Sequence, residues 1–283
     1  MKILLFLFLL ATVVVAEEDN YLRKRLNDQM VANENHFSLM PYKKNYIVFS
    51  ELFAGANTAP YTESYPNEQA LQYQDYELQL QVSLMVPIWL NMFGLPLTTY
   101  VAYTNRSFWQ FFDVYDSQPF RETNHEPEMW LAWFYDLNFG DFNAEMVWLG
   151  YEHQSNGQYI ELSRGWNRAY LDFFFNYNAF SLSFRPWISM TDGAHEDTIY
   201  NYDKYIGNGE VHGMYSWKHF DFSVNWTYSL SGMEYGSVMT DLDIPLSNFV
   251  SGYVRYFHGY GESLIDYNHK ANTLSAGIVL DTW

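Results

Sequence analysis

The chain has 283 residues and a formal net charge of −18, with 33 acidic and 15 basic side chains. Binding to nucleic acid depends on Lys and Arg that neutralise phosphates, so this balance argues against a nucleic-acid partner. The chain has no cysteine, which means that it folds without disulfides. Its 25 Tyr, 22 Phe and 10 Trp, together with a slightly negative mean hydropathy, are typical of a transmembrane β-barrel.

Two short segments precede the part of the chain that carries strand patterns. Residues 1–16 contain Lys2, an apolar run and small residues up to Ala16, which predicts a cleaved secretory signal peptide. The alternative, a membrane anchor, would need about 20 apolar residues, and the run is shorter. Residues 17–44 are charged and lack strand periodicity. We interpret them as a short N-terminal periplasmic extension.

Residues 45–283 alternate between apolar and polar side chains over long segments. The clearest run is 76–90, and 180–190, 220–230 and 274–280 repeat the pattern, while weaker candidates lie near 45–54, 97–112, 128–138, 197–206, 211–218 and 248–258. Such strands exceed the length of about 5–6 residues that is usual in soluble sheets. A sheet in lipid must close on itself, because an open edge would leave backbone groups unpaired. The sequence therefore predicts an all-β fold, a single transmembrane antiparallel β-barrel.

Three polar residues interrupt the apolar faces of two neighbouring predicted strands. On the first strand, His153 and Ser155 continue the face of Val147, Leu149 and Tyr151. On the next strand, Asn167 shares a face with Ala169 and Leu171. If the loop 156–163 joins the strands as a hairpin, His153 can lie opposite Asn167, at the roughly 4.5–5.5 Å of a cross-strand pair.

These residue types suit nucleophilic catalysis. A serine hydroxyl becomes a strong nucleophile when a neighbouring imidazole removes its proton, and the imidazole needs a partner that fixes its orientation. Polar side chains that face lipid are costly, so three of them together indicate a function. The alternative is that all three belong to the interfacial girdle, where polar side chains meet lipid headgroups. The G-x-S-x-G signature is absent, which disfavours an α/β-hydrolase.

The segments "EHQSNG" and "SRGWNR" resemble the outer membrane phospholipase A family, with the same intervening length. Further similar segments are "SFWQ", "PFRETNHEP" and "GYGESLIDYN". The resemblance implies a 12-stranded barrel with its active site facing the outer leaflet of the bacterial outer membrane. It also implies Ser155 as nucleophile, His153 as general base, Asn167 as the residue that orients His153, and the Gly157 N–H as a donor to the oxyanion. The reaction it implies is hydrolysis of sn-1 and sn-2 acyl esters of glycerophospholipids and of lysophospholipids.

The same resemblance implies Ca²⁺ as cofactor and a homodimer as the active form. The calcium ligands would be the Gln158 carbonyl, the Ser163 hydroxyl and Ser117 of the second subunit, and Glu161 in the same loop offers a further carboxylate. Asn105, on the outward face of the strand near 97–112, is expected at the dimer interface, where paired amides could hydrogen-bond. Two other functions are open at this point. One is a non-catalytic pore or structural barrel. The other is an adhesin or receptor barrel, which the short predicted loops disfavour.

Overall fold

The computed structural model describes residues 38–64, 73–114, 119–159, 161–190, 201–217 and 220–280. It also describes six helical positions nearer the N-terminus, Leu22, Arg25, Leu26, Gln29, Val31 and Ala32. The predicted signal peptide 1–16, most of the predicted extension 17–44, and Ser117 lie outside the described residues. Within the described residues, no helix is long and apolar enough to cross a membrane.

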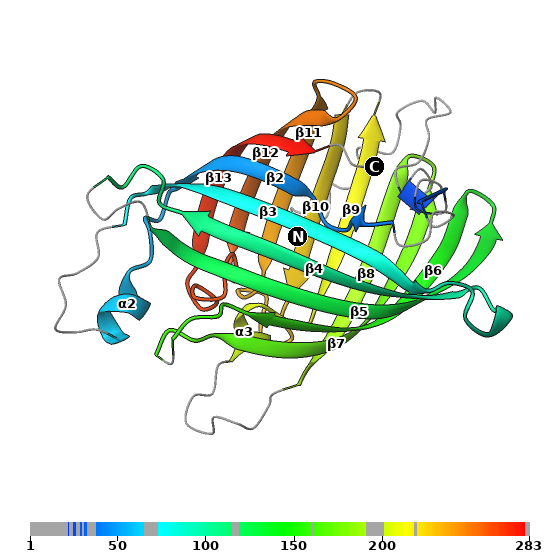
Figure 1. The fold of residues 1–283 in the computed structure, drawn as a ribbon, viewed down its shortest axis with the longest axis horizontal. Helices are drawn as coiled ribbons and strands as arrows, with labels where there is room; N and C mark the ends of the chain where they lie inside the picture. The colour runs from blue at the N-terminus through cyan, green and yellow to red at the C-terminus, as the bar shows by residue number, and fades with distance from the viewer. Residues whose placement is uncertain are drawn as a thin grey trace.

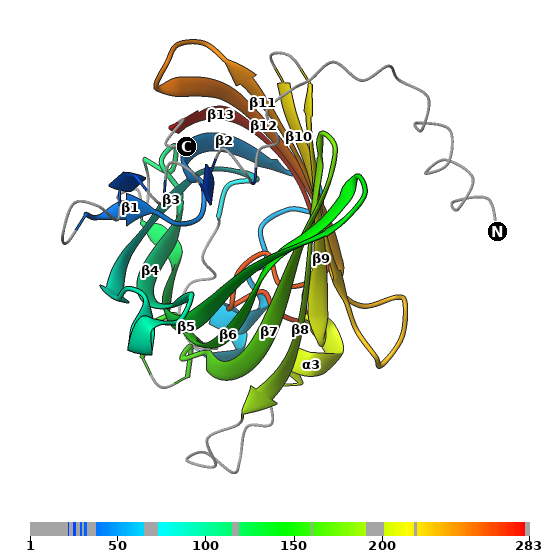
Figure 2. The same cartoon turned by 90° about the vertical axis from the view of Figure 1, so that its right-hand side faces the viewer.

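Twelve antiparallel strands form a closed barrel in chain order (Figure 1). They are β2 (Asn45–Leu52), β3 (Tyr76–Trp89), β4 (Leu97–Trp109), β5 (Phe120–Phe139), β6 (Phe142–Ser155), β7 (Gly165–Tyr177), β8 (Phe180–Met190), β9 (Gly209–Trp217), β10 (Phe220–Tyr228), β11 (Ser237–Pro245), β12 (Val250–Gly259) and β13 (Ala271–Leu280). Each pairs with the next, and β13 closes the ring by pairing with β2, where Ile278 lies opposite Ile47. A two-residue strand, β1 (Met40–Pro41), adds to β3. The predicted barrel is confirmed, and Figure 2 shows its strands curving round an enclosed interior.

The two ends of the barrel differ in the length of their connections. The long connections, including those with the helices α2 (Ala59–Ser64) and α3 (Tyr202–Tyr205), all lie at the end where β2, β4, β6, β8, β10 and β12 finish. The other end has short turns, such as that between β5 and β6 and the one containing the 3-10 helix η1 (Met92–Gly94). Outer-membrane barrels have short periplasmic turns and longer extracellular loops, so the long connections mark the extracellular end.

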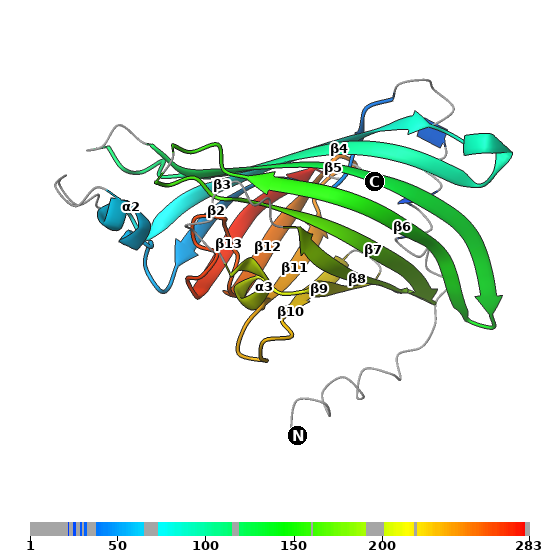
Figure 3. The same ribbon diagram turned by 90° about the horizontal axis from the view of Figure 1, so that it is seen from below.

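One side of the barrel is taller than the other. Strands β3 to β7 have 13–20 residues, whereas β8 to β13 have 9–11 (Figure 3). Side chains alternate along these strands, as on β4, where Val101 and Tyr103 are exposed while Ala102 and Thr104 are buried. The exposed positions carry the large apolar side chains that lipid covers, and the interior positions carry a dense polar network.

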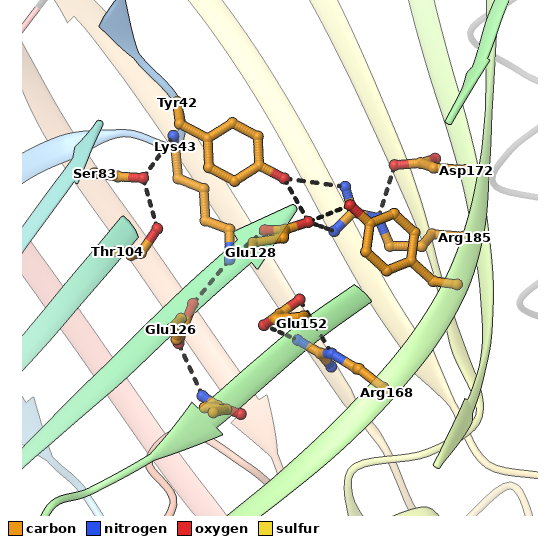
Figure 4. Close-up of polar contacts among 12 residues, drawn as sticks. Tyr42, Lys43, Ser83, Thr104, Glu126, Glu128, Glu152, Arg168, Asp172 and Arg185 are labelled. Carbon is orange, nitrogen blue, oxygen red and sulfur yellow. Dashed lines mark hydrogen bonds and ion pairs between the residues drawn. The ribbon is translucent and has the colours of Figure 1, made fainter. Parts of the chain in front are cut away.

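Residues at the end of the predicted extension fill part of this interior (Figure 4). The Tyr42 ring stacks on Trp130 at 4.8 Å. Its hydroxyl donates to Glu128 at 2.9 Å. The Lys43 ammonium lies 2.8 Å from Glu126, and that of Lys44 lies 2.9 Å from Asp243 on β11. The segment 42–44 therefore ties β5 to the far wall of the barrel.

The connection 260–270 between β12 and β13 folds into the extracellular mouth. Leu264 and Ile265 are each only 1% exposed, and their backbone N–H groups donate to Asn124 and Glu122. Asp266 pairs with Arg121 of β5 at 2.6 Å. The barrel interior is thus occupied by the segment 42–44 and, at the extracellular mouth, by the connection 260–270.

Two strand predictions were wrong. The part of the segment near 197–206 that the structure describes is not a strand but contains α3, whose Tyr202 is buried against the ring of Tyr267. The strand β11, by contrast, was not predicted at all. Its inward positions are acidic, Asp241 and Asp243, and they are buried against Arg255 and Lys44. One predicted strand is absent and one observed strand was not predicted, so the predicted number of strands agrees with the observed number.

Candidate active site on the outer surface

The β6–β7 hairpin carries the three predicted catalytic residues on the outside of the barrel. On β6, Glu152 and Gln154 are buried in the interior, whereas Tyr151 is 42% exposed, and His153 and Ser155 are half-buried on the same outer face. The hairpin end of both strands is at the extracellular side. The triad residues therefore lie where outer-leaflet lipid would contact the barrel wall.

His153 and Asn167 form a hydrogen-bonded cross-strand pair. They are opposite each other in the β6–β7 register, and Nδ1 of His153 lies 2.8 Å from Oδ1 of Asn167. An amide oxygen can only accept, so Nδ1 carries the proton and Nε2 keeps its lone pair. The Tyr151 hydroxyl donates to the same Oδ1 at 2.7 Å, and Asn167 is only 6% exposed. The arrangement fixes both the tautomer and the orientation that a general base requires.

Ser155 lies two residues from His153 on the same face of β6. Within the described residues its hydroxyl makes no hydrogen bond to His153, so the two are neighbours on one face rather than a bonded pair; such catalytic contacts often tighten only with substrate. Its cross-strand partner on β7 is Gly165, where an added Cβ would come within 3.5 Å of the Ser155 Cβ. The absence of a side chain at position 165 leaves the serine accessible.

Interior contacts hold the two strands in this register. The Arg168 guanidinium lies 2.6 Å from Glu152, directly across the strands (Figure 4). The Gln154 side chain accepts from the Trp166 indole at 2.8 Å and donates to Glu126 of β5 at 2.8 Å. A slip by one residue would turn His153 inward and separate these pairs, so the interior network specifies the outward triad.

Asn156 organises the loop that follows Ser155, a role that the sequence did not reveal. Its side-chain oxygen accepts from the backbone N–H of Gln158 and of Arg164, and its side-chain nitrogen donates to the Leu162 carbonyl at 2.9 Å. Between these anchors Gly157 has a φ of +61°, which suits glycine. The only sequence signal for this role was the position of Asn156 inside the "SNG" segment.

The predicted calcium ligands Gln158 and Ser163 lie in this same loop, and so does Glu161. All three offer oxygen atoms, a carbonyl, a hydroxyl and a carboxylate, which are the ligands that Ca²⁺ requires, so the residues fit the ion. Among the described residues, no group of three or more histidine, aspartate or glutamate side chains is arranged to hold a metal.

Asn105 lies on the outer face of β4, as predicted, but its amide has partners within the chain. Its oxygen accepts from the Ser107 hydroxyl at 3.1 Å, and its nitrogen lies 3.4 Å from Nδ1 of His125 on β5. His125 in turn lies opposite Ser155 in the β5–β6 register. Sequence analysis did not single out His125 as a site residue.

Comparisons with known proteins agree with this fold. The family model described as Phospholipase A1 matches residues 22–280. The chain is 30% identical over 300 residues to Phospholipase A1 of Escherichia coli. The alignment covers 98% of this chain and 96% of that protein. It superimposes on the solved outer membrane phospholipase A from Escherichia coli with a TM-score of 0.79 and 30% identity, covering 87% of this chain and 99% of that one.

A third similar structure is the Salmonella typhi outer membrane phospholipase dimer with bound calcium. Its TM-score is 0.79 at 29% identity, and the match covers 89% of this chain and 96% of that chain. Family model, relatives and solved structures all match the chain over most of its length. The chain belongs to the phospholipase A1 family and is a bacterial outer-membrane β-barrel.

Proposed function

We propose that the protein hydrolyses acyl ester bonds of outer-leaflet glycerophospholipids at the sn-1 and sn-2 positions, and those of lysophospholipids, with Ser155, His153 and Asn167 as its catalytic triad. The observation that carries the proposal is the hydrogen bond of 2.8 Å from His153 Nδ1 to Asn167 Oδ1 on the lipid-facing surface, with Ser155 on the same face. The family assignment supports the reaction class.

In the first half-reaction Ser155 Oγ attacks the ester carbonyl carbon and its proton passes to Nε2 of His153. The electron pair of the carbonyl π bond moves onto the oxygen, which accepts a hydrogen bond from the Gly157 N–H. The bond from carbon to the glycerol oxygen then breaks, and His153 returns its proton to that oxygen. Water repeats the sequence on the acyl-serine and releases the fatty acid.

Asn167 orients the imidazole through Nδ1 during both halves. An asparagine cannot neutralise the imidazolium as an aspartate does, but it also places no second charge at a membrane face. The hydroxyl of Tyr151 holds the Asn167 oxygen in place. The pair therefore maintains the base with neutral groups only.

Calcium is proposed as a cofactor, held by the Gln158 carbonyl and the Ser163 hydroxyl together with Ser117 of the second subunit. When bound, it would supply positive charge near the developing oxyanion. Because the ligands come from both subunits, dimerisation, calcium binding and activity would rise together. The related Salmonella typhi dimer with bound calcium supports this proposal.

A passive pore is the competing function, and the interior opposes it. Tyr42 and Lys43 fill one part of the lumen, and Leu264 and Ile265 are buried at its mouth. The proposal is tested by release of fatty acid from phospholipid in mixed micelles, with calcium and with chelator, using acyl chains labelled separately at sn-1 and sn-2. If neither position releases fatty acid in a calcium-dependent way, the proposal is refuted.

A further inference from the structure

A second histidine borders Ser155 from the neighbouring strand. His125 is half-buried on the outer face of β5, and it is the residue paired with Ser155 in the β5–β6 register. Ser155 therefore has one histidine two positions along its own strand, His153, and another directly across from it. The first is assigned above as the base, and the second has no role in the proposed reaction so far.

The contacts of His125 fix its tautomer. Nδ1 lies 2.6 Å from the Tyr103 hydroxyl and 3.4 Å from the Asn105 amide nitrogen. The amide is oriented by Ser107, whose hydroxyl donates to its oxygen, so its nitrogen faces the ring. An amide nitrogen can only donate, so Nδ1 is the acceptor and the ring proton is on Nε2.

The Nε2 edge of His125 faces the turn that follows Ser155. A Cβ atom built on Gly157 would lie 3.6 Å from both Cδ2 and Nε2 of His125. The proton on Nε2 is therefore beside the residue whose backbone N–H is proposed to bind the oxyanion. Oxyanions are stabilised best by two or more donors fixed in advance around one position.

The two histidines have opposite tautomers because their Nδ1 atoms have different partners. His153 donates through Nδ1 to Asn167, which leaves a lone pair on Nε2, the atom that must take a proton. His125 accepts through Nδ1 from Tyr103 and Asn105, which leaves an N–H on Nε2. One ring is thus arranged as a base and the other as a hydrogen-bond donor, on two sides of the same serine.

We propose that His125 is a further catalytic residue, whose Nε2–H donates a hydrogen bond to the carbonyl oxygen of the scissile ester and strengthens it as that oxygen becomes an oxyanion. No proton leaves His125 in this step: the serine proton goes to His153, and the new charge on oxygen is shared between the N–H groups of Gly157 and His125. Tyr103 and Asn105 are positioning residues that act through His125. This inference rests on the proposed function.

The test compares two variants at one position. His125→Phe keeps a ring of similar shape but no donor, and His125→Gln restores an N–H at about the position of Nε2. Since the interaction is made mainly in the transition state, His125→Phe should lower kcat on the order of 10²-fold with little change in KM. His125→Gln should recover most of that loss.

His258 provides the matched control. It is exposed on the outer face of β12, away from the β6–β7 hairpin, and His258→Phe makes the same replacement there. The control should retain native kcat, whereas an equal loss in His258→Phe would assign the effect to the lipid-facing surface in general. The folded fraction of every variant is measured by its heat-modifiable migration in detergent gels.

Two results would overturn the inference and leave the proposed function intact. One is a folded His125→Phe with native kcat, in a series where the native protein is active and Ser155→Ala is not. The other is a His125→Gln as impaired as His125→Phe, because a donor at the Nε2 position would then contribute nothing. An inactive native protein, or an active Ser155→Ala, would instead refute the proposed function itself.

Discussion

Nδ1 of His153 lies 2.8 Å from Oδ1 of Asn167, across two strands and on the outside of a membrane barrel. Most enzymes bury such a pair in a cleft. Here the pair lies on the outer wall of the barrel, with protein on one side and lipid on the other. The pair remains ordered because its strands are locked from the inside by Glu152 and Arg168.

Replacing the proposed nucleophile should remove activity and leave the fold unchanged. Ser155→Ala is expected to lower hydrolysis by at least about 10⁴-fold, because the oxygen that would form the acyl intermediate is removed. Its melting behaviour should match that of the native barrel, since a half-exposed hydroxyl contributes little to stability. Ser231→Ala, in an exposed extracellular connection, is the control and should stay fully active.

Removing the orienting amide should have a smaller effect. In Asn167→Ala the imidazole keeps its basicity but loses its fixed direction, so kcat should fall on the order of 10²-fold. Tyr151→Phe removes only the second hydrogen bond to the amide oxygen and should lose less. Steady-state kinetics on mixed micelles measures both. A loss in Asn167→Ala equal to that in Ser155→Ala would mean that the amide does more than orient His153.

Calcium and self-association should be coupled. In detergent, sedimentation should show a dimer with calcium and a monomer with chelator, and activity should follow the dimer. Ser163→Ala should raise the calcium concentration for half-maximal activity on the order of tenfold, because one oxygen ligand is lost. A fully active monomer, or a calcium response that Ser163→Ala leaves unchanged, would contradict the shared site. Ser231→Ala again serves as the control.

Acid should weaken the ion pair by which Asp266 holds the connection 260–270 in the extracellular mouth of the barrel. Burial alone would raise the pKa of Asp266, but the charge of Arg121 and hydrogen bonds from Ser263 and Asn57 hold it below its usual value. A carboxylate whose pKa is lowered by folding stabilises the folded state above its unfolded pKa of about 3.9, and this stabilisation is lost as the pH falls through the lower, folded value.

Asp266→Asn is therefore expected to destabilise the barrel at pH 7 by about 2 kcal/mol, because the buried Arg121 loses one of its two charge partners and keeps only Glu77. The difference from the native protein should shrink below about pH 4. Urea unfolding in lipid vesicles at several pH values measures it. Asp141→Asn, in an exposed periplasmic turn, should change stability little at any pH. A deficit in Asp266→Asn that persists unchanged into acid would argue against the linkage.

The sequence predicted the barrel and the outward face of His153, Ser155 and Asn167, because a period of two residues fixes which way each side chain points. It missed β11, because the inward positions of this strand are acidic and did not stand out as a strand pattern. The structure shows that they pair with Arg255 and Lys44. It also missed Asn156 and His125. Their roles depend on the turn after Ser155 and on the β5–β6 register, and neither is a property of a local pattern.

The segment 42–44 has a consequence for the order in which the barrel assembles. Tyr42 bonds Glu128 on β5, while Lys44 pairs with Asp243 on β11, nearly 200 positions further along the chain. These partners face each other across the lumen only once β5 and β11 belong to the same closed wall. Contacts of such long sequence separation form late, because the intervening chain must first be ordered. Residues 42–44 leave the ribosome before any of the twelve barrel strands, yet they are among the last to reach their native place, inside a wall that has already closed around them.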